Sequence, residues 1–157
     1  MDAAVLQMLK RAWSGEWYGV CVYEGLAEAR GDRDEASALR ELVALETYVL
    51  GELTTTLVAL GVEPDPQRLV DEVDRDLSAH RADPWPTLLD WLASDAETAL
   101  AEYLPLVELA DDDPDLVALA DLVVAHERAL IAFARGSAAG APDPLAEVRA
   151  LLGSESP

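Results

Sequence analysis

The sequence predicts an all-α fold, a bundle of long helices that form one domain over residues 1–157. Apolar residues make up 51% of the chain and are mostly Ala, Leu and Val. Ala and Leu have high intrinsic helix propensities. These apolar residues recur at spacings of three and four, which is the period of an amphipathic helix. Glycine and proline separate such stretches, as expected where helices are joined by turns.

The first two helices are predicted over residues 2–30 and 34–60. Gly31 and Gly61 follow their last turns, and glycine is common just beyond the end of a helix because it tolerates the left-handed conformation. The connection between the two stretches is only a few residues long. Two helices joined in this way are expected to lie antiparallel as a hairpin.

Residues 61–85 are predicted to form a crossover, because proline and turn residues interrupt the helical pattern there. Two further long helices are expected over residues 86–110 and 115–135, followed by a short helix over 144–152. The aspartate-rich turn at 111–114 is interpreted as a cap for the fourth long helix. A hairpin, a long crossover and a second hairpin form a common arrangement of four helices.

The net charge of −20 comes from 31 acidic and 11 basic residues. A surface this negative repels phosphate backbones and anionic lipids, so neither nucleic acid nor a membrane is expected as a partner. No apolar run is judged long enough to cross a bilayer. The single cysteine, Cys21, excludes an internal disulfide, and the N-terminus lacks a signal-peptide pattern. A cytoplasmic location is therefore expected.

The two halves of the chain share a pattern of glutamates. An interval of 81 residues separates Glu16 from Glu97, and the same interval separates Glu46 from Glu127. The turn inside each half also falls at a matching position. We interpret this agreement as an internal duplication of a helical hairpin.

The same four glutamates are the candidate functional residues. Glu16, Glu46 and Glu127 lie within the apolar stripes of their helices, as does Glu97, although Ala96 belongs to a competing stripe on that helix. Burying a carboxylate is unfavourable unless it is protonated, paired or bound to a cation. Three interpretations remain open: a metal site, a metal-free pocket for an organic molecule, or solvated acids at the bundle edge that pair with arginine.

Three segments resemble the ferritin-like superfamily, particularly its rubrerythrin-like and di-iron carboxylate members: GEWYGVCVYEGLAEARGD, ELVALETYVLGELTTTLVALG and LADLVVAHERALIAFARG. The resemblance covers about residues 10–136 and implies a ferritin-like four-helix bundle. In that superfamily the first and third helices each give a Glu, which Glu16 and Glu97 match. The second and fourth each give Glu-x-x-His, whose acid Glu46 and Glu127 match. The resemblance implies two divalent metal ions, often iron or manganese.

The chain departs from that pattern at both histidines, which are replaced by Val49 and Leu130. An all-oxygen site would suit manganese, magnesium or calcium better than iron. His126 lies one residue from the expected ligand phase and is interpreted as a structural group, a general base or a displaced ligand. Tyr23 and His126 are the candidate catalytic residues.

Three functions follow as hypotheses. The first is a non-haem di-metal oxidoreductase with the four glutamates as ligands. The second is a metal-free protein whose pocket binds or converts a small organic molecule by acid–base chemistry. The third is a self-associating structural or storage protein, for which Trp85 and Trp91 are candidates for an exposed apolar patch. A homodimer is expected from the resemblance.

Overall fold

The computed structural model describes residues 2–31, 33–110 and 113–153, and within these ranges the chain is helical with no strand. This confirms the predicted all-α class. The helices are α1 (Ala3–Arg30), α2 (Asp34–Ala59), α3 (Val70–His80), α4 (Trp85–Leu109), α5 (Pro114–Ala138) and α6 (Ala146–Gly153), and a short 3-10 helix covers Gln67–Leu69.

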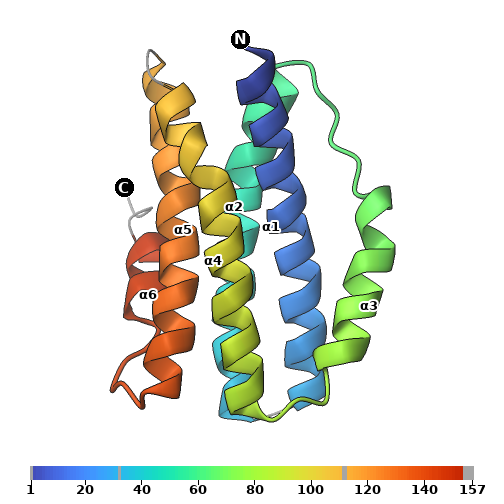
Figure 1. The fold of residues 1–157 in the computed structure, drawn as a ribbon, viewed down its shortest axis with the longest axis vertical. Coiled ribbons are helices and arrows are strands. Elements are labelled where there is room, and N and C mark those ends of the chain that lie inside the picture. The colour runs from blue at the N-terminus through green and yellow to red at the C-terminus, as the bar shows by residue number, and fades with distance from the viewer. Residues whose placement is uncertain (1, 32, 111–112, 154–157) are drawn as a thin grey trace.

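The four long helices form two antiparallel hairpins (Figure 1). One hairpin is α1 with α2, the other is α4 with α5, and they pack with α1 against α4 and α2 against α5. The crossover between the hairpins carries α3 along the outer side of α1. The short α6 folds back onto α5 and α2.

The helix ends follow local capping chemistry. The Asp2 side chain accepts a hydrogen bond from the backbone N–H of Ala4 at the start of α1. Gly31 ends that helix with φ of 64°. At the start of α5 the Asp113 carboxylate accepts from the backbone N–H groups of Asp115 and Leu116, as predicted for this turn, although residues 111 and 112 lie outside the described ranges. Each cap satisfies backbone groups that the helix leaves unpaired.

The end of α5 differs from the prediction. The helix continues through Gly136 to Ala138, and Gly140, with φ of 70°, follows its end. The following chain folds back near Gly136, where a Cβ would meet the Cβ of Pro144 at 3.5 Å, an ordinary van der Waals contact. Gly136 therefore lies inside the helix without terminating it, and Gly140 takes the positive φ beyond the helix end.

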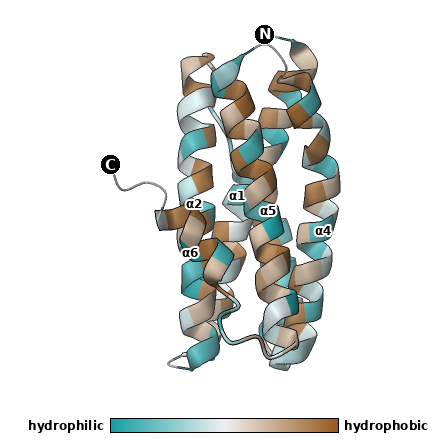
Figure 2. Ribbon diagram, turned by 90° about the vertical axis from the view of Figure 1, so that its left-hand side faces the viewer, coloured by the Kyte–Doolittle hydropathy of each residue, from teal (hydrophilic) through white to brown (hydrophobic). Residues whose placement is uncertain are grey.

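The buried apolar side chains of the four long helices form one core cluster, and Figure 2 shows apolar and polar residues alternating along each helix. Each fully buried leucine contributes roughly 1.5–3 kcal/mol of hydrophobic free energy. The largest fully buried side chains include Leu9, Leu26, Leu39, Leu45, Leu53, Leu88, Leu89 and Phe133. Among the described residues, the same interior also contains the buried polar side chains of Glu16, Arg30, Glu46, His126 and Glu127.

Arg30 has a structural role at one end of the bundle. Its Nη2 donates to the backbone carbonyl of Asp83 at 3.0 Å, and its Nε lies 3.2 Å from a carboxylate oxygen of Glu35. The guanidinium also lies 5.7 Å from the ring centroid of Trp85, in range for a cation–π interaction. Arg30 thus joins the end of α1 to the start of α2 and to the segment that precedes α4.

Trp85 and Trp91 do not form the exposed apolar patch considered from the sequence. Both side chains are partly buried. Trp85 packs edge-on against Phe133, and Trp91 stacks on the ring of His80 with centroids 4.2 Å apart. The large exposed apolar residues of the described ranges are Val58, Leu60, Val70, Leu104 and Leu109.

By length and composition alone, α2 could cross a membrane, and no other helix of the described ranges meets that criterion. This corrects the expectation that no run was long enough. Core helices of globular proteins meet the same criterion. Here α2 packs against α1, α5 and α6 and carries the buried Glu46 near its centre.

Candidate functional site

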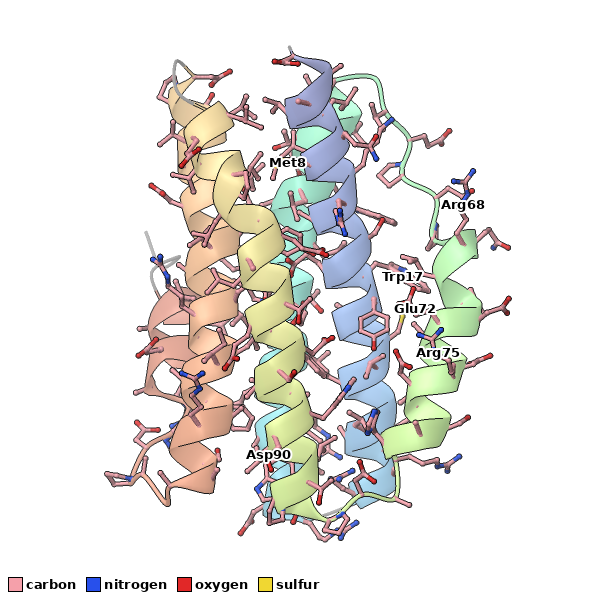
Figure 3. The ribbon with its side chains drawn as sticks, in the orientation of Figure 1. Met8, Trp17, Arg68, Glu72, Arg75 and Asp90 are labelled. Atoms are coloured by element: carbon pink, nitrogen blue, oxygen red, sulfur yellow. The ribbon has the colours of Figure 1, made fainter. Side chains whose placement is uncertain are left out.

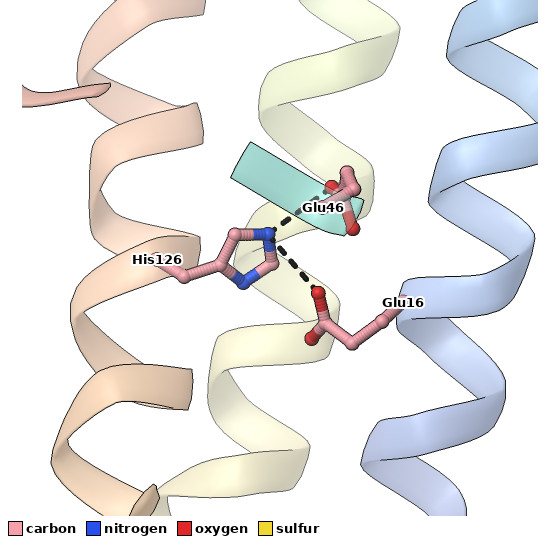
Figure 4. Close-up of side chains that lie close together, drawn as sticks. All are labelled: Glu16, Glu46 and His126. Atoms are coloured by element: carbon pink, nitrogen blue, oxygen red, sulfur yellow. Dashed lines mark ion pairs between the residues drawn. The ribbon is translucent and has the colours of Figure 1, made fainter. Parts of the chain in front are cut away.

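Three buried polar side chains from three helices meet inside the bundle (Figure 4). Glu16 comes from α1, Glu46 from α2 and His126 from α5, and their exposed fractions are 1%, 2% and 1%. The His126 Nε2 atom lies 3.3 Å from Oε2 of Glu16 and 3.1 Å from Oε1 of Glu46. We refer to these three residues as the Glu–Glu–His cluster.

The position of His126 follows from the breadth of the buried stripe on α5. Val123 and Leu130 are buried, and His126 and Glu127 between them are both buried as well. Successive residues on a helix are rotated by about 100°, so both face the interior only where neighbouring helices cover a wide sector. The shift of one residue from the ligand phase therefore does not remove His126 from the site.

Among the described residues, Glu16 and His126 have buried polar atoms that lack a hydrogen bond when both acids are ionised, whereas a protonated Glu16 donates a hydrogen bond to Glu46. Within the described part of the chain, both carboxylate oxygens of Glu16 and both ring nitrogens of His126 are buried without a hydrogen-bond partner. Nε2 is close to two carboxylate oxygens, but the angles do not allow a hydrogen bond with either. Buried polar atoms in this state are rare in proteins and require an explanation.

Burial has large effects on the acids of this region. It raises the pKa of Glu16 well above its ordinary value; His126 opposes the shift and Glu46 adds to it. Burial also raises the pKa of Glu46, to about 8. The pKa of Glu127 is likewise raised by burial, and His126 opposes this shift. Without a cation, these carboxyl groups therefore favour the protonated form.

Glu127 and Tyr23 lie close to the cluster, as the sequence predicted for the interior. Oε1 of Glu127 is 3.9 Å from the Nδ1 atom of His126, on the other nitrogen of the ring from Glu16 and Glu46. Tyr23 is buried in α1, and this burial raises the pKa of its hydroxyl. Both residues line one cavity, whereas Glu16 and His126 do not line it.

Glu97 lies outside the cluster, which corrects the expectation that all four glutamates face one core. Its side chain is 45% exposed and forms an ion pair with Arg135 of α5. The adjacent Ala96 is buried instead. The stripe of α4 that contains Ala96 and Tyr103 therefore faces the interior, and Glu97 is rotated out of it.

Asp95 is the residue of α4 that the sequence reasoning missed. It is partly buried, and burial raises the pKa of its carboxyl to about 6, with Asp76 and Glu72 adding to the shift. It lines the same cavity as Glu46 and Glu127. Asp95 directly precedes Ala96, which belongs to the competing apolar stripe of α4, and this position was the available signal that Asp95 is partly buried.

A cavity of about 340 Å³ extends between α1, α3 and α4 and has Glu46 and Glu127 in its wall. Three tyrosines, Tyr18, Tyr23 and Tyr103, also line it. The interior acids are thus in contact with a space large enough for a small molecule.

Two glycines of α1 make room for side chains from other helices. A Cβ at Gly19 would lie 2.6 Å from the carboxylate carbon of Glu46. A Cβ at Gly15 would overlap the hydroxyl of Tyr103. Glycine inside a helix costs about 1 kcal/mol relative to alanine, so two of them on either side of Glu16 were a readable signal of close approach.

Comparisons of the chain with protein-family models, with curated proteins and with solved structures gave no match. A functional assignment therefore depends on the residues of the site itself. Within the described ranges, Glu16, Glu46 and His126 form the one group of three or more acidic, imidazole or thiol side chains whose ligand atoms all lie within 4.8 Å of one another.

Proposed function

We propose that the chain binds a divalent metal ion through Glu16, Glu46 and His126. The observation that supports this proposal is the convergence of one imidazole nitrogen and two carboxylate oxygens, all buried and within 4.8 Å of one another. Imidazole and carboxylate together suit first-row ions such as manganese, iron and zinc. An ion would satisfy the buried lone pairs and offset the charge of the acids.

The separations agree with this proposal. Two ligands at about 2.1 Å from one ion are about 3.0 Å apart in octahedral geometry and about 3.4 Å apart in tetrahedral geometry. The distances from Nε2 to the two carboxylate oxygens, 3.1 and 3.3 Å, fall between these values. An ion could therefore bind with little movement of these side chains.

The ligands present favour one ion over the two implied by the resemblance to ferritin-like proteins. Glu97 is exposed, and Val49 and Leu130 offer no ligand atom. His126 supplies the imidazole from a different helical position. We therefore propose a ferritin-like bundle with a mononuclear site. A redox-active ion bound there would supply electron transfer with oxygen or peroxide.

Glu127 is proposed to orient His126. Its carboxylate lies on the Nδ1 side of the ring, 3.9 Å away and beyond hydrogen-bonding distance, and its charge electrostatically favours a proton on that nitrogen. The Nε2 lone pair then faces Glu16 and Glu46. Carboxylates beside the second nitrogen of a histidine commonly fix its tautomer in metal sites.

Elemental analysis of protein purified from manganese- and iron-supplemented cells tests the proposal. We expect about one ion per chain in the wild type and no bound ion in Glu46→Ala, because buried ligands dominate affinity. Glu97→Ala is the matched control and is expected to retain the ion. Metal retained in Glu46→Ala, or lost in Glu97→Ala, would contradict the proposed ligand set.

Gly19→Ala is expected to weaken manganese binding by about tenfold or more, because outer positions that fix a ligand commonly contribute this much. The new Cβ would collide with the Glu46 carboxylate. Gly51→Ala is the control, since a Cβ there meets nothing within 4 Å and α2 gains helix propensity. Competition with a fluorescent chelator measures both affinities. Equal affinities in the two variants would show that Gly19 does not position Glu46.

The cavity favours a second candidate, a metal-free pocket that performs acid–base chemistry on a small organic molecule. It is in contact with Glu46 and Glu127, whose pKa values are raised by burial. A carboxyl that retains its proton near neutral pH can serve as a general acid. This alternative predicts ligand-induced stabilisation that persists in a chelator, in protein that contains no metal.

A further inference from the structure

We propose that the cavity beside the Glu–Glu–His cluster binds a small organic cation that carries a primary ammonium group. Any chemistry done on this cation would rest on the proposed metal site at the Glu–Glu–His cluster. Binding of the cation itself is measurable in metal-free protein.

Three buried polar side chains line the cavity without a hydrogen bond in the described ranges: Tyr23, Tyr103 and Glu127, with exposed fractions of 3%, 4% and 4%. The Nδ1 atom of His126 is 3.9 Å from Glu127, beyond hydrogen-bonding distance. The oxygen atoms of these three side chains are not among the fully buried unpaired atoms of the described residues, so they are accessible from the cavity. A hydroxyl pair and a carboxylate at one cavity wall therefore form a built site for a polar ligand.

The charge of the cavity selects a cation. Arg11 is the one basic residue among the described residues of its wall, and it already forms an ion pair with Glu102 at 2.7 Å. A concave site whose wall carries charge of one sign and has a low dielectric constant concentrates ions of the opposite charge. The acidic residues of the wall are Glu46, Glu72, Asp76, Asp95, Glu102 and Glu127.

The walls favour an organic cation over a hydrated metal ion. The volume of about 340 Å³ is within the range of small-molecule sites, which begins near 300 Å³. Aromatic and apolar side chains contribute to the wall alongside the acids, including Ala99, Leu130 and the three tyrosines. An ammonium group donates three hydrogen bonds, its alkyl part gains from apolar contact, and aromatic faces attract the charge.

Helix α3 forms the outer wall of this site. The Tyr18 hydroxyl donates to Asp76 at 2.7 Å and so joins α1 to α3. Glu72 of α3 lines the same cavity and is labelled between α1 and α3 in Figure 3. Glu72 and Asp76 of α3 therefore contribute acids to the wall, and both also form ion pairs with Arg75 of the same helix.

Isothermal titration of metal-free protein with n-butylamine tests the proposal, and n-butanol is the uncharged ligand of matched shape. We expect saturable binding of the amine at a single site and no binding of the alcohol. Glu127→Gln should weaken the binding of n-butylamine by about tenfold or more, because the bound ammonium group loses the carboxylate that pairs with it. Asp121→Asn, an exposed change of equal charge on the same helix, should change the affinity little.

Ala99→Phe tests shape without changing any charge. The added ring fills the cavity from its α4 wall, so amine binding should be lost while metal content stays at the wild-type value. Binding of equal strength in Ala99→Phe, Glu127→Gln and Asp121→Asn would overturn the proposal and indicate attraction by bulk charge. Failure of the metal proposal would instead appear as metal retained by Glu46→Ala in elemental analysis. The amine titration does not use that variant.

Discussion

Raising the pH from about 5 to about 8 is expected to lower the free energy of unfolding of the metal-free protein by several kcal/mol. Burial raises the pKa of Glu46 from 4.5 to about 8. Between those values the native state holds a proton that the unfolded chain has released, so stability falls as the pH rises. The full shift corresponds to on the order of 5 kcal/mol at 1.36 kcal/mol per unit.

Urea unfolding in the presence of EDTA at the two pH values measures this change. Saturating manganese at the higher pH is expected to restore stability, because an ion that binds only the native state stabilises it. Glu46→Gln should reduce the pH dependence, since the amide does not titrate, and should leave the part contributed by the raised pKa values of Glu16, Glu127 and Asp95. Stability that rises over the same window would show that the native carboxylates are ionised and paired.

The sequence allowed much of the fold to be predicted because helix punctuation is local. The start of α1 after Asp2, its end at Gly31 and the cap at Asp113 all depend on neighbours within a few residues. The end of α5 was mispredicted because two nearby glycines could end it, and the one that takes the positive φ beyond the helix is Gly140, not Gly136. A single sequence does not distinguish a glycine that ends a helix from one that lies within it.

The candidate site was predictable where one apolar stripe dominated a helix. The burial of Glu16, Glu46 and Glu127 followed from such stripes. On α4 two stripes competed, one residue and about 100° apart, and the choice between Ala96 and Glu97 depends on contacts with other helices. The cavity could not be predicted either, because α1, α3 and α4 contribute its wall from distant parts of the chain.

Glu16→Gln is expected to stabilise the metal-free protein at pH near 8 and to abolish metal binding. Both carboxylate oxygens of Glu16 are buried without a hydrogen-bond partner in the described ranges, and burial disfavours their charge. An amide has nearly the same shape, carries no charge and can donate to Glu46. The amide removes the cost of either burying the charge or taking up a proton on folding at this pH, and should raise the free energy of unfolding by about 1–3 kcal/mol.

A substitution that raises the free energy of unfolding but removes metal binding identifies a carboxylate kept for function, whereas one that lowers the free energy of unfolding identifies a structural carboxylate. Glu97→Gln is the matched control: its exposed ion pair with Arg135 should contribute no more than about 1 kcal/mol, and its loss should leave metal binding intact. Denaturant unfolding in EDTA and metal titration at the same pH provide the two measurements. If Glu16→Gln lowered the stability of the metal-free protein, Glu16 would be a structural partner within the core. A variant that is more stable but binds no metal would show that Glu16 is unfavourable for folding and required for the ion.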